Sequence, residues 1–581
     1  MNNGETCSAW AQRFGERGAR RFKACLLASV VGVAGLSGAQ AFAGSLDAGQ
    51  PQDGGAAVAN APAVQLADNT PAAPAPTAAA SVTWSDKLGS GVLERLANYY
   101  KLEWGQVGPP ADPNAPTSRR ANVPPQPENS PPMPFTEWPY GGTTNLGTNR
   151  TASVDSPLMV AIANTGVGKF MSATGLQAYG WVDYGGNLSS SKNKYGNSPA
   201  AYDFQPNAIS LDQAVLYVER TPDTVQTDHI DWGFRLSAIY GTNYRYTTAY
   251  GIASYQLLKN NAGMGYDFPM VYAEAFIPNV AQGLIVRVGR YISLPDIEAQ
   301  LAPNNYMYTH SITYTLDNYT NEGVQATLQA TKNVILQLGV SDGTEAAIWN
   351  VNATLPNLDP NPLYPNKTFL KDPGAQPTVT ACARYESDSA KDNLYICGNG
   401  INKGTFGYNN LQWYGVTYYH KWNDHWHIAV EIYNEHQNNV PNSLNPAVSG
   451  YITNGGTPFS PQYIPFNAPN AAQCKNPNAL DCSAVSQSAL TYLNYQPGPL
   501  DNLSFRAEYY DDEEGQRTGT ATIYYDVGIG WQHWLGAQVE LRPEVSYYWS
   551  TKPAFDGNPY LGISPDKRQQ TVWAGDIIWH F

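Results

Sequence analysis

Two short patterns in the chain have residue types and spacings that could support catalysis or metal binding. Gly339-Val340-Ser341-Asp342-Gly343 matches G-x-S-x-G, in which a serine nucleophile lies on a tight turn between a strand and a helix. A long polar segment follows Gly343 instead of a helix. His425, His427 and Glu431 fall on one face of an expected strand, a spacing that could form a metal site. We prefer to interpret them as polar lumen residues near a rim. We therefore predict no catalytic residue, no metal site and no enzymatic activity.

A dense acidic group lies at the tip of an expected hairpin. Asp511, Asp512, Glu513 and Glu514 follow one another directly. Ca²⁺, or lipopolysaccharide bridged by it, would neutralise such a group, because carboxylate oxygens are the ligands that Ca²⁺ prefers. A solvated hairpin tip explains the same residues without a ligand. We prefer the solvated tip and predict no cofactor, with Ca²⁺ at this tip as the alternative.

Charged side chains also recur on neighbouring segments near the end of the chain. Glu540 with Glu544, and Arg506 with Glu508, could serve as general acid and base. Mixed charges facing a wet lumen explain the same residues without a reaction, because such charges set the ion preference of a pore. The choice depends on the elements that carry them.

Those elements are strands with a two-residue period. In residues 230–240, Trp232 and Leu236 share one face and Arg235 lies on the other, because strand side chains alternate between the two faces. The same alternation recurs in residues 324–330, 503–510, 521–531 and 538–549.

A soluble β-sandwich, with one wet face per sheet, would also alternate. Two features favour a membrane barrel instead. The segments run for about 9 to 13 residues, the length that a tilted strand needs to cross a bilayer. Their apolar faces end in Trp or Tyr, as in the aromatic girdles of outer-membrane barrels.

The connections between these segments alternate in length, as they do in such barrels. Short ones lie at 221–227, 278–282, 331–333, 422–424 and 498–502, and long ones at 242–265, 294–318, 343–407, 437–487 and 550–568. We predict an all-β fold: a transmembrane antiparallel up-and-down β-barrel of about 14 strands, within a range of 12 to 18, over residues 171–581. The aromatic stretches 244–261 and 294–306 are predicted to fold into the lumen or to pack over its mouth.

The N-terminal part differs from the rest. Five basic residues, an apolar run from about Ala24 to Gly38 and the small-residue site Ala41-Phe42-Ala43 predict a cleaved export signal over residues 1–43. Residues 44–170 are predicted to be an Ala/Pro-rich periplasmic linker, which is disordered over about 44–82 because large apolar residues are nearly absent there. One short helix is expected near 84–104.

Charge and cysteine content restrict the partners and the compartment. Removing residues 1–43 takes away five positive and two negative charges, so the formal net charge falls from −14 to −17. A chain this acidic is a poor ligand for nucleic acid. Cys382 with Cys397, and Cys474 with Cys482, are close in sequence, and export to an oxidising compartment predicts two short-range disulfides within two long outer loops.

Three segments of the chain resemble a known family. They are residues 287–315 (RVGRYISLPDIEAQLAPNNYMYTHSITYT), 231–241 (DWGFRLSAIYG) and 515–534 (GQRTGTATIYYDVGIGWQHW). They resemble the β-barrel porin-2 (OmpL-like) family of Gram-negative outer-membrane barrels over about residues 170–581. The resemblance implies pore activity in the outer membrane, and it carries no substrate or catalytic residue.

We accordingly predict a porin that passes small hydrophilic solutes or ions by passive diffusion, in contact with outer-membrane lipid and lipopolysaccharide. The alternative is a non-conducting surface barrel whose disulfide-closed outer loops bind a ligand or partner. The residues predicted to line the lumen are Arg235, Glu274, Arg287, Arg506, Glu508, Glu540, Arg542 and Glu544.

The chain ends in Ala574-Gly575-Asp576-Ile577-Ile578-Trp579-His580-Phe581. Alternation places Trp573, Ile577, Trp579 and Phe581 on one face, and Asp576 and His580 on the other. The family resemblance implies that this aromatic end is the signal read by the barrel assembly machinery. We predict that the first face contacts lipid and that the second faces the lumen.

Overall fold

The computed structural model describes residues 84–102, 146–147, 156–292, 296–344 and 377–581, apart from short gaps at 201, 249–252, 254–255, 257–261, 318–319, 407–409, 447, 450–470, 499, 537 and 558–562. The predicted export signal at 1–43 and most of the predicted linker lie outside the described residues. Among the described helices, none is long and apolar enough to cross a membrane.

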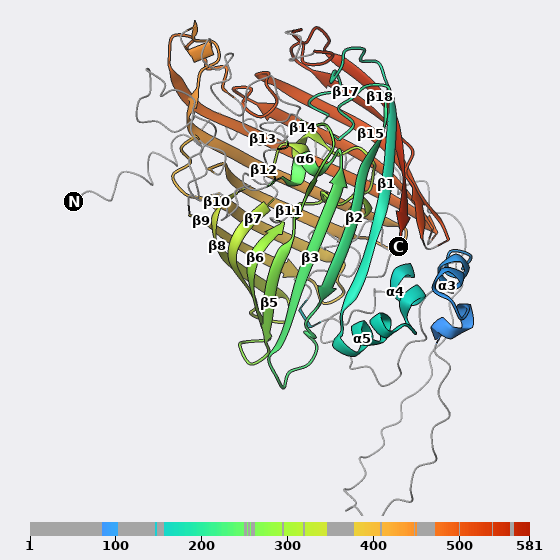
Figure 1. Ribbon diagram of the computed structural model, residues 1–581. Helices are drawn as coiled ribbons and strands as arrows, with labels where there is room; N and C mark the ends of the chain where they lie inside the picture. The colour runs from blue at the N-terminus through green and yellow to red at the C-terminus, as the bar shows by residue number, and fades with distance from the viewer. Residues whose placement is uncertain are drawn as a thin grey trace, which may run out of the picture. The chain divides into compact units, whose positions relative to one another are not determined.

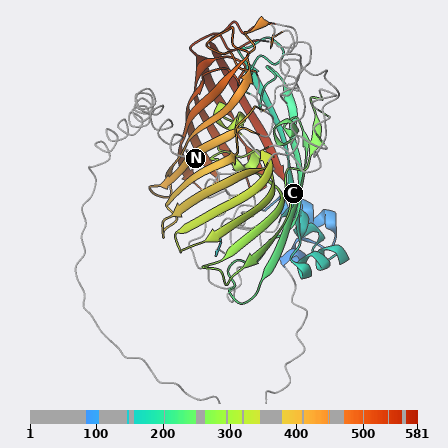
Figure 2. The ribbon, with the colours of Figure 1, turned by 90° about the vertical axis from the view of Figure 1, so that its left-hand side faces the viewer.

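The strands form one closed antiparallel barrel, seen from two sides in Figures 1 and 2. They are β1 (Gln177–Ser189), β2 (Ile209–Arg220), β3 (Asp231–Gly241), β4 (Gly265–Asp267), β5 (Val271–Ile277), β6 (Leu284–Ile292), β7 (Thr320–Gln329), β8 (Val334–Thr344), β9 (Thr378–Glu386), β10 (Asp392–Ile401), β11 (Gln412–Lys421), β12 (Trp426–Pro441), β13 (Asp481–Gly498), β14 (Asp501–Asp512), β15 (Thr522–Leu535), β16 (Val539–Leu541), β17 (Glu544–Ser550) and β18 (Gln569–His580).

Two pairs of these segments each form one interrupted strand of the wall. β4 and β5 both pair with β3, and β16 and β17 both pair with β15 and with β18. Pro269 and Pro543 lie at the two interruptions, where a residue without a backbone N–H cannot donate to the ladder. The wall therefore has 16 strands, which confirms the predicted barrel within its range of 12 to 18.

The strand number exceeds the predicted 14 because residues 343–407 are not a single outer loop. They contain the hairpin β9–β10, which pairs with β8 on one side and β11 on the other. The outward positions of β9 are Val379, Ala381, Ala383 and Tyr385. Two of these four are alanine, so the apolar face is a weak signal in the sequence.

The barrel closes between its first and last strands. β1 pairs with β18 in antiparallel register from Trp181 opposite His580 to Ser189 opposite Val572. Phe581 extends the seam, because its backbone N–H donates to Gly180 O at 2.8 Å and its carbonyl accepts from Gly180 N at 2.9 Å. The terminal phenylalanine therefore belongs to the closing ladder.

The two faces of the wall differ in polarity, as the two-residue period predicts. Apolar side chains such as Trp232, Leu338 and Trp573 are more than half exposed on the outside. Polar side chains at the alternate positions, such as Arg235, Gln337 and Asp576, are buried on the inside. The outer apolar band suits lipid contact.

Four helical segments precede β1 in the part of the chain that the structure describes, whereas the sequence predicts one helix. The expected helix near 84–104 consists of η1 (Trp84–Leu88) and α3 (Val92–Tyr99). α4 (Pro157–Ile162) and α5 (Gly166–Thr174) are short helices within the predicted linker, and Ser156 and Thr165 cap their N-termini. Tyr100 Oη donates to His580 O, so this helical segment contacts the seam of the barrel.

Candidate functional site

The interior of the barrel is occupied by residues 296–317, between β6 and β7, which we call the inner loop. It contains the short helices η2 (Ala302–Asn304) and α8 (Ile312–Thr315). Nearly all of its side chains are buried. Such burial is unusual for a loop of this length, because its backbone polar groups then need partners from the barrel wall.

Charged side chains of the wall provide many of those partners. Glu508 on β14 accepts hydrogen bonds from Ile312 N, at 3.0 Å, and from the backbone and hydroxyl of Thr313. Glu544 on β17 accepts from Thr309 N at 3.1 Å. Arg506 on β14 donates to Thr309 O at 2.5 Å. Residues 309–313 of the inner loop are therefore held by three charges on β14 and β17, the two strands that flank β15.

The middle of the inner loop is held by other parts of the wall. Arg542 donates to Ala302 O at 2.6 Å and to Asn305 O at 3.1 Å. Three strands further around the wall from β17, Gln213 of β2 donates to Gln300 O at 2.6 Å and accepts from Ala302 N at 3.0 Å.

Both ends of the inner loop contact β12. Glu431 accepts from Ile297 N at 3.0 Å, and Tyr433 Oη donates to Thr313 O at 2.5 Å. With the contacts to β2, β14 and β17, these bonds connect the loop to well-separated strands of the wall. The inner loop thus crosses the lumen.

Inward-facing glycines make room for the inner loop. A Cβ at Gly185 would lie 2.2 Å from Tyr308 Oη, and a Cβ at Gly530 would lie 2.8 Å from Met307 Cγ. At Gly528, the nearest loop atom would be Met307 Cε, at 3.0 Å. These three inward-facing glycines therefore lie against the inner loop, where a side chain would not fit without a shift.

The second stretch predicted to enter the lumen, 244–261, is described only in part. Its helix α6 (Tyr244–Thr247) is fully buried, and Gln300 of the inner loop donates to Tyr246 O at 2.5 Å. Tyr202 stacks between Tyr246 and His310, with ring centroids 4.4 and 3.6 Å away. Burial lowers the pKa of His310 to about 3, so this ring is neutral at physiological pH.

All eight residues predicted to line the lumen are buried on inward strand positions, and most are paired with opposite charge. Arg235 lies 2.6 Å from Glu219, Arg287 lies 3.2 Å from Glu274, and Arg506 and Arg542 pair with Asp526 and Asp576. Glu540 accepts from Gln532 at 2.6 Å and contacts His580 Nε2 at 2.7 Å. Their role in permeation stays a prediction.

The sequence pattern did not identify the partners of these charges. Glu219, Asp526 and Asp576 alternate with apolar residues in the same way as the predicted set, but pairing depends on which strands are neighbours. The register places Arg506 opposite Gly528, next to Asp526. Cross-strand register, which the strand pattern leaves open, therefore decides the pairs.

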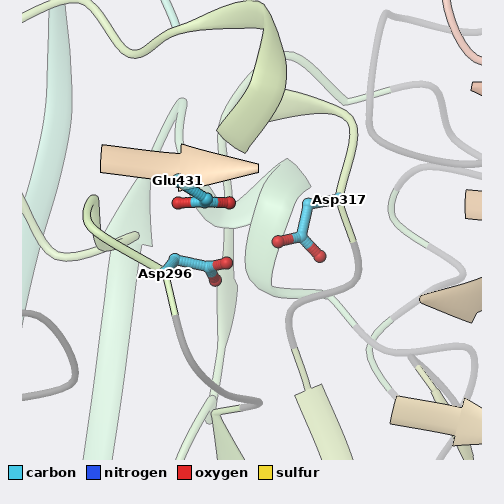
Figure 3. A group of neighbouring side chains, drawn as sticks. All are labelled: Asp296, Asp317 and Glu431. Carbon is cyan, nitrogen blue, oxygen red and sulfur yellow. The ribbon is translucent and has the colours of Figure 1, made fainter. Parts of the chain in front are cut away.

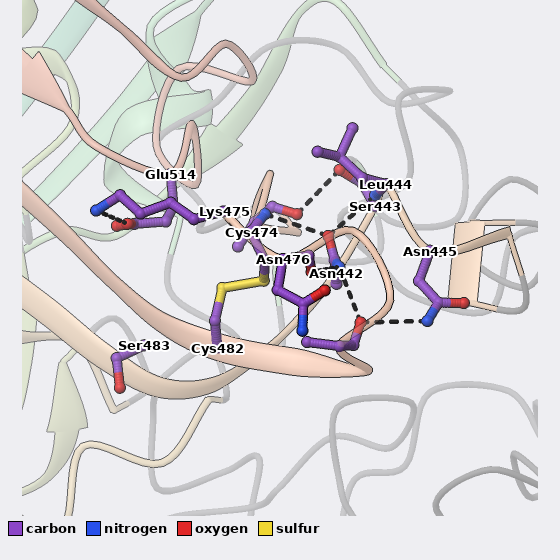
Figure 4. Close-up of a disulfide and its surroundings, with 12 residues drawn as sticks. Asn442, Ser443, Leu444, Asn445, Cys474, Lys475, Asn476, Cys482, Ser483 and Glu514 are labelled. Atoms are coloured by element: carbon purple, nitrogen blue, oxygen red, sulfur yellow. Dashed lines mark hydrogen bonds and ion pairs between the residues drawn. A yellow bond between two sulfur atoms is a disulfide. The ribbon is translucent and has the colours of Figure 1, made fainter.

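Both predicted disulfides are present, Cys382–Cys397 and Cys474–Cys482. Only the second involves a long connection: it joins Cys474, between β12 and β13, to Cys482, the second residue of β13, near Asn442 and the Lys475–Glu514 ion pair (Figure 4). Cys382 and Cys397 are directly opposite each other on β9 and β10. The prediction that both bridges close outer loops is therefore wrong for Cys382–Cys397, because its segment is a hairpin of the wall.

The acidic tip is bonded to protein. Asp512 accepts from the backbone N–H groups of Gln516, Arg517 and Thr518 at 2.7 to 3.0 Å. Glu513 and Glu514 both lie 3.2 Å from Lys475 Nζ. These partners neutralise much of the tip, so the geometry does not favour the Ca²⁺ alternative there.

The two catalytic or metal patterns of the sequence are not assembled either. Ser341 and Asp342 lie within β8, so the turn that a nucleophile requires is missing. His427 contacts the rings of Tyr306 and Tyr419. Glu431 is four residues further along β12, or about 13 Å away.

Asp203, in the connection between β1 and β2, is a buried carboxyl outside the strands. Neither carboxylate oxygen has a hydrogen-bond partner among the described residues. Burial, and then the nearby Glu544 charge, raise the pKa of Asp203 from 3.8 to about 8. Between these two pH values the folded state keeps a proton that the unfolded chain has released, so stability decreases as the pH rises.

Asp203→Asn should therefore stabilise the barrel, and more so at pH 9 than at pH 5. The expected difference between the two gains is on the order of a few kcal/mol. Samples are incubated at increasing temperatures at each pH and loaded on SDS gels without boiling. The measurement is the incubation temperature at which the folded band disappears. Asp228→Asn, at a carboxylate that is 82% exposed, is the matched control. Equal gains at both pH values would contradict the raised pKa.

The chain shares little sequence identity with proteins of known structure. No curated protein matches it. The solved structures to which it is similar include the anion-selective porin from Comamonas acidovorans, with 10% sequence identity and a TM-score of 0.39 over 70% of this chain and 99% of that chain. In-vitro folded OmpT of Vibrio cholerae (11% identity) and the outer membrane channel DcaP of Acinetobacter baumannii (9% identity) each have a TM-score of 0.38 over 70% of this chain and 97% of theirs. At such low similarity we transfer no property from them.

The family comparison covers the whole barrel. The model described as "Putative beta-barrel porin-2, OmpL-like" matches residues 175–581. This range begins immediately before β1 and ends at the terminal Phe581, so it includes the inner loop and every strand. The chain belongs to this family of β-barrel porins.

Proposed function

We propose that the protein is a passive outer-membrane channel for small hydrophilic solutes or ions, and that the inner loop sets its width. The observation that carries the proposal is a 16-stranded closed wall whose charged inner face holds a loop across the lumen. Barrels of 16 to 18 strands leave an aqueous channel, whereas 8-stranded barrels are filled by their own side chains. A crossing loop in so wide a barrel reduces an otherwise large opening.

The charge pairs around the inner loop support passive selection by size. Each of Arg235, Arg287, Arg506 and Arg542 has a carboxylate partner. Paired charges present weak net fields to a passing ion. We therefore propose that solute size contributes more to selection than the sign of charge, and that none of these residues performs a reaction.

The proposal extends to location and partners. The exposed apolar band suits outer-membrane lipid, and the basic, apolar N-terminal segment suits an export signal. Connections are short at the end of the barrel where α4 contacts β1 and long at the other end. By the usual arrangement of such barrels, the helices lie in the periplasm and the long connections, with lipopolysaccharide, outside.

The test is single-channel recording of the folded protein in planar bilayers. Discrete ohmic steps, with permeation of uncharged sugars in liposome swelling that falls with sugar size, are expected. A heat-modifiable barrel that gives neither conductance nor swelling would overturn the channel and favour the alternative of a surface barrel that binds a ligand through its outer connections.

Deleting Phe581 should lower the yield of inserted barrel severalfold in cells, because it removes both the aromatic end and two seam hydrogen bonds to Gly180. The measurement is the folded band in outer-membrane fractions. Phe581→Gly separates the two causes, since it keeps the backbone bonds and removes the ring. An unchanged yield after the deletion would contradict an assembly role of the terminal residue.

A further inference from the structure

The two ends of the inner loop meet at a group of three carboxylates on one side of the lumen. Asp296 and Asp317 are the first and last described residues of the loop, and Glu431 lies on β12. One carboxylate oxygen from each lies within 4.8 Å of the others. Figure 3 shows the three groups facing a common point. The two ends of the inner loop, which are 21 positions apart in sequence, thus lie next to the same strand of the wall.

Asp317 and Glu431 are buried and Asp296 is half-buried, and one oxygen of Glu431, Oε1, has no protein donor among the described residues. The other oxygen of Glu431, Oε2, accepts the Ile297 N–H. By contrast, both carboxylate oxygens of Glu298 accept hydrogen bonds, Oε1 from Tyr492 Oη at 2.6 Å and Oε2 from Ser311 Oγ. A buried carboxylate oxygen without a partner is costly, which calls for a cation at the point that it faces.

The donor atoms select the kind of cation. All three side chains offer oxygen, which suits Ca²⁺ or Mg²⁺ and not Zn²⁺, whose protein ligands are mainly nitrogen and sulfur. Two ligands of one ion are separated by at most twice the ion–oxygen distance, about 4.6 to 5.2 Å for Ca²⁺ and about 4.2 Å for Mg²⁺. These oxygens lie within 4.8 Å of one another, which permits one ion to contact all three. Three carboxylate ligands favour Ca²⁺, because Mg²⁺ is usually held by one or two carboxylates and keeps several waters.

We propose that Asp296, Asp317 and Glu431 bind one Ca²⁺ ion, which closes the base of the inner loop and fastens it to β12. This site lies away from the Asp511 to Glu514 tip, where the sequence suggested Ca²⁺ as an alternative, and it departs from the prediction of no metal site. It does not depend on the transport proposal. It adds a means of holding the loop across the lumen, because Ca²⁺ ties both ends of the loop to the same strand.

The test uses the full chain refolded in detergent without lipopolysaccharide, stripped with EDTA and titrated with CaCl2 in a calorimeter. We expect one bound Ca²⁺ per chain and roughly tenfold or greater weakening by Glu431→Gln or by Asp317→Asn. Asp424→Asn, at a carboxylate that is 95% exposed, and Glu513→Gln, at the acidic tip, should leave binding unchanged. Mg²⁺ should bind more weakly than Ca²⁺.

A second measurement serves if a variant does not fold. Ca²⁺ should raise the unfolding temperature of the wild-type barrel above its value in EDTA, because a ligand of the folded state stabilises that state. Wild-type barrel that takes up no Ca²⁺, or that binds it equally well after Glu431→Gln and Asp317→Asn, would overturn the site. Loss of binding in Glu513→Gln alone would assign the ion to the acidic tip and overturn it as well.

Discussion

Replacing residues 297–316 by a short Gly/Ser linker should increase the single-channel conductance severalfold. The inner loop crosses the lumen, and a 16-stranded wall without it encloses a water-filled channel. Four linker residues span about 13 Å, which is enough to join Asp296 and Asp317, whose carboxylate oxygens lie within 4.8 Å of each other. The wall charges that now bond the loop would then face water.

The same variant should also change selectivity. Glu508 and Glu544 would lose the hydrogen bonds that they accept from backbone N–H groups of the loop. Arg542 would lose the hydrogen bonds that it donates to the carbonyls of Ala302 and Asn305. Rings of hydrated charge give ion preference. Reversal potentials in a salt gradient measure this. An unchanged conductance in a heat-modifiable barrel that lacks the loop would show that the inner loop does not limit the channel.

Arg506→Met should produce the largest loss of stability among single substitutions of the wall. The guanidinium pairs with the fully buried Asp526 and also donates to Thr309 O, at 2.5 Å, and to Tyr548 Oη, at 3.0 Å. Removing it leaves Asp526 as a buried carboxylate without its cation and releases the inner loop at Thr309. Breaking a buried ion pair in this way costs about 3 to 5 kcal/mol.

The measurement for Arg506→Met is the midpoint of urea unfolding in lipid vesicles. Lys421→Met is the matched control, because Lys421 lies 3.1 Å from Asp424 in a pair whose carboxylate is 95% exposed, and such surface pairs contribute about 0 to 1 kcal/mol. Adding Asp526→Asn to Arg506→Met should restore part of the loss, since no unpaired charge remains. Equal midpoints for Arg506→Met and Lys421→Met would contradict the anchoring role.

The paired charges also explain a property of the fold. The two arginines that hold the inner loop, Arg506 and Arg542, each have a carboxylate partner on a neighbouring strand. Arg542 illustrates this, because Asp576 accepts two of its bonds and leaves Nη1 for the loop. The pairs therefore orient the donors before the loop binds to them.

The sequence by itself determined the barrel class, the direction of the strand faces and the family. The reason is that a two-residue period reports burial directly: Trp573 and Trp579 alternate with Val572, Ile578 and His580, and the structure exposes the first set and buries the second. Alternation is a local property, and neighbouring residues encode it completely. The length contrast between connections, local in the same sense, indicated how the two ends of the barrel differ.

The tertiary structure decided the strand number, the charge partners and the acidic group at the base of the inner loop. The hairpin β9–β10 has a weak apolar face and is recognised by pairing with β8 and β11. Asp296, Asp317 and Glu431 are separated by up to 135 positions. The sequence pattern grouped Glu431 with His425 and His427, and it did not connect Glu431 with either aspartate. Register and loop path bring such residues together, and both depend on the closed wall as a whole.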